Sequence, residues 1–219
     1  MTDAYQQTRR SLHALAELVI AGPRFRQTGD LRLRVRPDGF GTWEAPVVAV
    51  AGGHVVTDDG RFPVDGLTYD EVAARAGLRA SGLDDVYGDG PHVATTETVR
   101  LDVEAVREVE EALVLGDRAL AAFRPDAERT LWPEHFDVAT TVEDVNYGVS
   151  PGDAYSEVPY AYVGPHRPLS GAFWNAPFGA ARPLSELRDV AATAAFFADG
   201  ARLAASGGFP PPGDSTGPV

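Results

Sequence analysis

Residues 130–142, TLWPEHFDVATTV, place three side chains capable of acid–base chemistry within a few positions of each other. Glu134, His135 and Asp137 supply two carboxylates and an imidazole, groups that commonly act as general acid and base. An alternating pattern over 136–142 predicts a strand, so these residues stand where a strand begins. Glu134, His135 and Asp137 are therefore the catalytic candidates of this chain.

The expected pairing of two strands adds a second histidine to this group. If 136–142 pairs antiparallel with 158–164 across the intervening loop, His135 comes close to His166. Two imidazoles and Glu134 would suit a zinc ion that keeps one position open for water. This metal site is one alternative, and a structural corner in which aromatic side chains plug the core is another. We expect neither a metal nor a cofactor in this protein.

Aromatic and polar side chains of the second half indicate a small-molecule site. The segment EDVNYGVSPGDAYSE, residues 143–157, reads as a long loop rich in carboxylates and tyrosines. Such groups suit a polyhydroxylated or cationic ligand, although they could equally cap turns and shield the end of a sheet. We expect a pocket between the C-terminal strands and a helix. Its expected ligand-binding residues are Trp132, Asn146, Tyr147, Asp153, Tyr160, Tyr162, Trp174 and Asn175.

Composition excludes several kinds of chemistry and partner. The chain has 219 residues and a formal net charge of −13, which would repel nucleic acids and anionic membrane surfaces. All 19 basic residues are arginine, so no lysine is present for a Schiff base or a phosphate-binding P-loop. The absence of cysteine removes thiol nucleophiles, disulfides and cysteine-ligated metals.

The N-terminal segment TRRSLHALAELVIAG predicts a buried amphipathic helix. Its paired arginines are followed by apolar residues, as in an export signal, but His13 and Glu17 interrupt the apolar run. No run in the chain approaches the roughly 20 apolar residues that span a bilayer. We therefore expect a cytoplasmic protein that binds neither membranes nor nucleic acids. Its oligomeric state does not follow from the sequence.

Hydrophobic periodicity and turn residues predict an α+β fold with mainly antiparallel pairing. Two meanders are expected over 30–64 and 136–178, the first with turns at Pro37-Asp38-Gly39, Gly52-Gly53 and Asp58-Asp59-Gly60. Helices are expected over 5–21, 69–77, 103–123 and 185–204, with Gly22-Pro23 ending the first. We expect residues 1–206 to form one domain, which could consist of two closely packed halves, 1–124 and 125–206. Residues 207–219 are expected to form a disordered tail.

Four segments resemble a family of conserved actinobacterial proteins to which no function is assigned. They are RLRVRPDGFGTWE, LWPEHFDVATTV, VNYGVSPGDAYSEVPYAYVGP and FWNAPFGAARPLSEL, and together they extend over most of the chain. The resemblance implies a cytosolic actinobacterial protein and no particular reaction, ligand or catalytic residue. Where the family has an aromatic residue in YVGPW, this chain has His166, which removes support from the two-histidine metal site.

Three functions are consistent with these observations. The leading hypothesis is a protein that binds a small polar molecule in a pocket of the C-terminal meander. The second is a hydrolase or lyase that uses Glu134 and His135 for acid–base chemistry, with or without a metal. The third is a non-catalytic protein-interaction module that uses its acidic helix or its tail.

Overall fold

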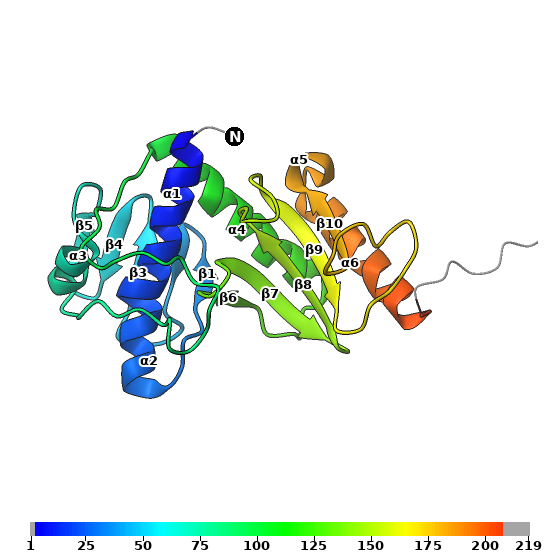
Figure 1. Cartoon of the computed structure of the whole chain (residues 1–219), viewed down its shortest axis with the longest axis horizontal. Helices are drawn as coiled ribbons and strands as arrows, with labels where there is room; N and C mark the ends of the chain where they lie inside the picture. Colours follow the sequence, from blue (N-terminus) through cyan, green and yellow to red (C-terminus); the bar gives the residue numbers. More distant parts are fainter. Residues whose placement is uncertain (1–2, 208–219) are drawn as a thin grey trace, which may run out of the picture.

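The computed structural model describes residues 3–207 and contains two antiparallel five-stranded sheets with helices packed on them (Figure 1). This confirms the expected α+β class. The first half contains α1 (Asp3–Ala14), the π-helix η1 (Leu15–Ala21), α2 (Gly22–Thr28), β1 (Arg34–Arg36), β2 (Gly39–Gly41), β3 (Val48–Ala51), β4 (His54–Thr57), β5 (Gly60–Pro63) and α3 (Tyr69–Arg75). The second half contains α4 (Val103–Phe123), β6 (Thr130–Trp132), β7 (Asp137–Val142), β8 (Val145–Ser150), β9 (Tyr160–Pro165), β10 (Ala180–Pro183), α5 (Leu184–Leu187) and α6 (Val190–Ala205).

The first sheet follows the turn chemistry of the sequence. Its five strands pair in chain order, β1-β2-β3-β4-β5. Tight turns fall at Pro37-Asp38, Gly52-Gly53 and Asp58-Asp59, and both glycines of the middle turn have positive φ angles of 54° and 73°. Glycine adopts that conformation without a steric penalty. The meander expected over 30–64 is therefore confirmed together with its hairpins.

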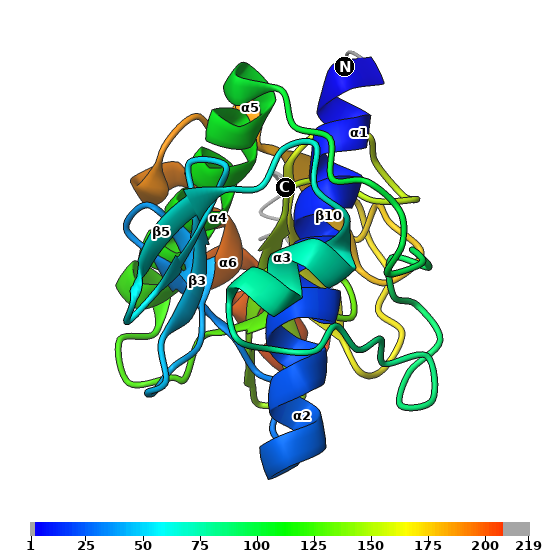
Figure 2. The same ribbon diagram turned by 90° about the vertical axis from the view of Figure 1, so that its left-hand side faces the viewer.

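The first helix does not end at Gly22-Pro23, so the expected boundary was wrong. Figure 2 shows α1 and α2 as one continuous column crossed by α3. The helix continues through Pro23 because its hydrogen bonds change from the α-helical to the π-helical pattern ahead of the proline. In this pattern the N–H of Gly22 bonds to the carbonyl of Glu17, five residues earlier. The column ends at Thr28, where Gly29 takes a left-handed φ of 76°.

A contact from another part of the chain completes this helix. In the π-helical pattern the carbonyl of Leu18 would bond to the N–H of residue 23, which proline lacks. The N–H of Ser81 supplies the missing bond at 2.9 Å. Gly22 makes this approach possible, because a Cβ at that position would lie 1.7 Å from the carbonyl oxygen of Ser81.

Capping residues set the beginnings of α3 and α4 where the sequence predicted them. Thr68 and Glu71 form the expected reciprocal capping box at the start of α3. Asp102 accepts a hydrogen bond of 3.0 Å from the N–H of Ala105 at the start of α4. The helix expected over 103–123 is confirmed with the same bounds.

Two glycines bring α4 and α6 against one face of the second sheet. A Cβ at Gly116 of α4 would lie 2.6 Å from the Cβ of Val149 in β8. A Cβ at Gly200 of α6 would lie 2.7 Å from Cγ2 of Val163 in β9. Close packing of this kind leaves no space for a ligand between these helices and the strands at these positions. The other face of the sheet is turned away from both helices (Figure 1).

The second sheet has a different register from the one expected. Residues 143–157 do not form one long loop, because Glu143 and Asp144 make a two-residue turn, with φ angles of 53° and 60°, that leads directly into β8. β7 pairs with β8, and β8 pairs with β9. Since β8 lies between the strands that were expected to pair, His135 and His166 lie at opposite ends of the sheet. The expected pairing of 136–142 with 158–164 was wrong, and the meeting of the two histidines that depended on it does not occur.

The last part of the fold also differs from expectation. The helix expected over 185–204 is two helices, α5 and α6, separated at Arg188, whose φ is 69°. The strand suggested by the sequence over 171–180 is confined to β10, which begins at Ala180. Ahead of it, Asn175 folds back and bonds to the backbone N–H and carbonyl of Ala181 at 2.9 and 3.1 Å. The expected disordered tail, 207–219, lies outside the described residues except for Gly207, which belongs to a turn.

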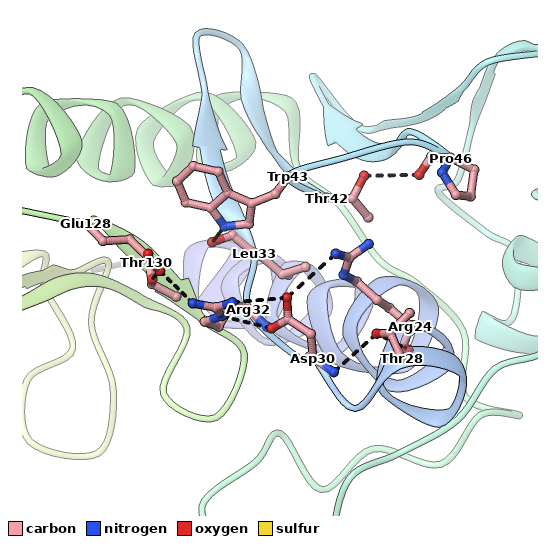
Figure 3. A network of polar contacts seen from close by, with 10 residues as sticks. All are labelled: Arg24, Thr28, Asp30, Arg32, Leu33, Thr42, Trp43, Pro46, Glu128 and Thr130. Atoms are coloured by element: carbon pink, nitrogen blue, oxygen red, sulfur yellow. Dashed lines mark hydrogen bonds and ion pairs between the residues drawn. The ribbon is translucent and has the colours of Figure 1, made fainter.

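The two sheets meet beside their first strands. Leu33, just before β1, and Leu131, in β6, exchange backbone hydrogen bonds of 3.1 and 2.9 Å. Beside this bridge Arg32 forms ion pairs with Asp30 at 2.9 Å and with Glu128 at 2.8 Å (Figure 3). Exposed ion pairs contribute roughly 0–1 kcal/mol each, so the buried leucines carry most of the contact. The two meanders are therefore separate sheets joined at this bridge.

No helix within residues 3–207 combines the length and the apolar character needed to cross a bilayer. The expected single domain of residues 1–206, with or without a division near residue 125, stays a prediction.

Candidate functional site

A groove of about 480 Å³ lies on the face of the second sheet that is turned away from α4 and α6. Alternation along the strands brings polar and aromatic side chains of β7, β8 and β9 to this face, while Val138, Val149 and Val163 point to the helices. The groove is lined by His135, Asp137, Asn146, Ser150, Asp153, Tyr160, Tyr162, Gly164, Pro165, His166 and Phe178.

Asp137 is the most deeply buried charged group of the groove, with 4% of its surface exposed. Its Oδ2 atom accepts a short hydrogen bond from the hydroxyl of Tyr162. Its Oδ1 atom is buried and has no hydrogen-bond partner among the described residues. Burial raises the pKa of Asp137 to about 6, although the bond from Tyr162 opposes this shift. Burial and the adjacent carboxylate raise the pKa of Tyr162 well above its ordinary value.

A second tyrosine–aspartate pair lies two residues earlier on β9. The hydroxyl of Tyr160 donates to Oδ2 of Asp153 at 2.6 Å. The other carboxylate oxygen of Asp153 accepts hydrogen bonds from the N–H groups of Tyr155 and Ser156, at 2.8 and 3.1 Å. Asp153 is therefore held by its own loop, and its carboxylate is fully engaged. Burial and the bond to Asp153 raise the pKa of Tyr160.

Aromatic rings of Tyr160, Tyr162 and Phe178 line the groove, and Tyr155 lies beside them in an adjoining cleft. Phe178 meets Tyr155 edge to face with ring centroids 4.8 Å apart, and it lies 6.2 Å from the ring of Tyr162. Tyr155 and Tyr160 are 5.5 Å apart. Tyr155 is 46% exposed and Phe178 is 37% exposed, so solvent reaches these rings although each contacts another ring. Exposed aromatic rings beside a polar groove are typical of ligand sites.

His135 stands at one end of the groove, and Glu134 lies beside it. The Nε2 atom of His135 is 3.9 Å from Oε2 of Glu134, which exceeds hydrogen-bond distance. Asp89 joins them, and one ligand atom from each of the three residues lies within 4.8 Å of the others. His166 is not part of this cluster; its Nε2 lies 3.2 Å from Oδ1 of Asn146 at the other end of the groove. All three residues of the cluster remain partly or fully exposed.

Seven of the residues named from the sequence line the groove together, and five others do not. The seven are His135, Asp137, Asn146, Asp153, Tyr160, Tyr162 and His166. Glu134 lies beside His135 but does not line the groove. Tyr147 faces the opposite side of the sheet and packs on Phe123 with centroids 4.7 Å apart. Trp132 lies on the edge strand, Trp174 packs against Phe173 at 4.9 Å, and Asn175 bonds to the backbone.

Sequence reasoning missed Ser150 and Phe178, which line the groove. Ser150 belongs to the segment read as one loop, and recognition of β8 would have placed it on the same face as Asn146. Phe178 lies ahead of β10 in a segment that the sequence suggested as a strand, so its place beside the groove was not predicted.

Two other hollows adjoin the C-terminal sheet. A cleft of about 680 Å³ between α1 and the second half shares His135, Asp153, Tyr160 and Phe178 with the groove, and Arg9 also lines it. A hollow of about 370 Å³ lies between the β7–β8 turn and α6. It has the position expected from the sequence, between the strands and a helix, but Tyr147 is the one expected ligand-binding residue that lines it.

We predict that Gly148→Ala separates Tyr162 from Asp137. A Cβ at Gly148 would lie 2.5 Å from the hydroxyl oxygen of Tyr162, so the ring must move. Loss of this fit should lower the free energy of unfolding by about 1–3 kcal/mol. Gly164→Ala is the matched control on the next strand, because its Cβ would lie 3.6 Å from the nearest atom, an ordinary contact. Urea denaturation of both variants measures the difference, and equal stabilities would contradict this role of Gly148.

No family model, curated protein or solved structure matches the chain.

Proposed function

We propose that the protein binds a small polar molecule in the groove on the open face of its second sheet. The observation that carries this proposal is the carboxylate of Asp137, which is buried on the groove floor with one oxygen paired to Tyr162 and the other unpaired. A volume of about 480 Å³ is within the usual range for small-molecule sites.

A buried carboxylate oxygen without a partner is unfavourable in the empty protein. A buried unsatisfied polar group costs about 1–3 kcal/mol, and more when it is charged. A ligand that donates a hydrogen bond to Asp137 would recover part of this cost. The fixed partners of Asp153 and Tyr160 would hold the neighbouring wall in place, so little ordering is needed on binding.

Acid–base catalysis by Glu134 and His135 has weaker support. The Nε2 atom of His135 and the Oε2 atom of Glu134 are 3.9 Å apart, and His135 is about half exposed, so neither group is fixed by the other. Asp137 is held more firmly, by its bond from Tyr162. Its unpaired oxygen indicates a hydrogen-bond donor on a ligand but does not indicate which bond a reaction would break. Binding therefore explains the described geometry with fewer assumptions than a hydrolase or lyase reaction does.

A screen of small polar metabolites tests the proposal. We expect at least one compound to raise the unfolding temperature of the wild-type protein, because a ligand that binds the native state stabilises it. Calorimetric titration should then show that Asp137→Asn weakens binding of that compound by at least about tenfold. Asp144→Asn is the matched control, since it makes the same charge change on the same sheet, at an exposed turn outside the groove.

Two results would contradict the proposal. One is a complete absence of binding across the library. The other is a ligand whose affinity is the same for the Asp137→Asn variant and the wild-type protein, because that ligand would bind elsewhere.

A further inference from the structure

We infer that the ligand of the groove is a protonated amine, an alkylammonium ion that carries at least one N–H group. This inference rests on the proposed function and names the chemical class of the ligand. Three independent features of the groove support it: the sign of its charges, its aromatic wall and the unpaired oxygen of Asp137.

The fixed charges of the groove are negative. Asp137 and Asp153 contribute carboxylates, and among the described residues that line the groove none is an arginine. The chain has no lysine. Arg9 lines the adjoining cleft and not the groove, but its charge acts on Asp153, so Asp137 is the carboxylate of the groove without a nearby arginine. An anionic ligand would therefore meet like charge, whereas a cation would meet opposite charge.

The aromatic wall also favours a cation. Tyr160, Tyr162 and Phe178 line the groove, with ring centroids 6.2 to 6.4 Å apart. Tyr155, in the adjoining cleft, packs on Tyr160 and Phe178 at 5.5 and 4.8 Å. The faces of aromatic rings carry negative potential and attract alkylammonium groups, most strongly where water is partly excluded. The rings also provide apolar contact for the alkyl part of such a ligand.

The unpaired oxygen of Asp137 selects for a cation that donates a hydrogen bond. Tyr162 already donates to Oδ2, so Oδ1 is the atom that lacks a partner. A quaternary ammonium ion could contact the rings but has no N–H to give. A neutral alcohol could donate to Oδ1 but would leave the carboxylate charge unbalanced. A protonated amine satisfies the rings and the carboxylate together.

Three probes separate these contributions: n-butylammonium, its neutral analogue butan-1-ol, and tetramethylammonium, which lacks N–H. Their binding to the full-length protein can be followed by changes in amide chemical shifts during titration at about pH 7.5, where Asp137 is ionised and the amine is protonated. We expect n-butylammonium to bind at least about tenfold more tightly than butan-1-ol. Tetramethylammonium should fall between them, and the shifted resonances should belong to β7, β8 and β9.

Two variants and a control assign the effect to the groove. Asp137→Asn should remove the preference for n-butylammonium over butan-1-ol. Phe178→Leu keeps an apolar side chain on the exposed rim, so the protein should fold, and it should weaken n-butylammonium and tetramethylammonium more than butan-1-ol. Asp144→Asn should leave all three affinities unchanged.

The outcomes distinguish the inference from the proposed function. If butan-1-ol binds as tightly as n-butylammonium, or if a polyol from the metabolite screen binds while neither ammonium ion does, the ligand class is wrong and the binding function stands. If no probe and no library compound binds in a way that depends on Asp137, both fail.

Discussion

Asp137→Asn is expected to make the protein more stable at neutral pH, by about 1–3 kcal/mol. Burial raises the pKa of Asp137 from its ordinary 3.8 to about 6 in the folded protein, and each unit of pKa difference corresponds to roughly 1.4 kcal/mol. The folded state thus binds this proton more tightly than the unfolded state. Ionisation therefore costs stability as the pH rises from about 4 to about 6, and the cost remains above that range.

Urea denaturation of the wild-type and Asp137→Asn proteins across this pH range measures the effect. The difference in the free energy of unfolding should be small near pH 4 and should reach its full value above about pH 6. Asp144→Asn, an exposed change of the same kind, should show no comparable gain. If the Asp137→Asn protein were less stable than wild type above pH 6, the unpaired carboxylate would not be the liability described above. A gain in stability with a loss of binding would show that the charge is retained for function.

Gly22→Ala is expected to lower the free energy of unfolding by about 3 kcal/mol. The new Cβ would lie 1.7 Å from the carbonyl oxygen of Ser81, a backbone atom that cannot rotate away. Displacement of Ser81 would also break its N–H bond to the carbonyl of Leu18, and Pro23 cannot replace that bond. The cost therefore combines a steric overlap with an unsatisfied carbonyl in the buried helix.

Gly88→Ala is the matched control for this substitution. Gly88 lies in the same long connection as Ser81, and a Cβ there would have no atom within 4 Å. We expect this variant to remain within about 0.5 kcal/mol of wild type. Equal denaturation midpoints for the Gly22→Ala and Gly88→Ala proteins would mean that the close approach of Ser81 is not required.

The parts of the fold that the sequence predicted have local causes. Thr68 and Glu71 mark the start of a helix by themselves, and the Gly52-Gly53 turn defines a hairpin without help from distant residues. The helix over Gly22-Pro23 was misjudged because Ser81, almost sixty positions later, supplies the bond that proline removes. A contact between segments so far apart leaves no pattern in the intervening sequence.

The candidate site was predicted in composition but not in geometry. Asp153 and Tyr162 were named because carboxylates and tyrosines suit a ligand, and Asp137 was named as a catalytic candidate. All three line the groove. The turn at Glu143-Asp144 lacks the glycine that usually marks a two-residue hairpin, so β8 was read as a loop. Without β8, the expected register of the sheet was wrong. Because side chains alternate along a strand, the position of Tyr147 in the core could not be predicted either.

The bridge between Leu33 and Leu131 has a consequence for how the chain folds. Within each sheet every strand pairs with a strand adjacent to it in the chain, so those pairings close short loops. The bridge instead joins positions 98 residues apart (131 − 33). Loop-closure entropy makes such a pairing the costlier one to form early. Each meander can thus form from its own hairpins. The backbone bridge between the two sheets adds few long-range strand pairings that must form during folding.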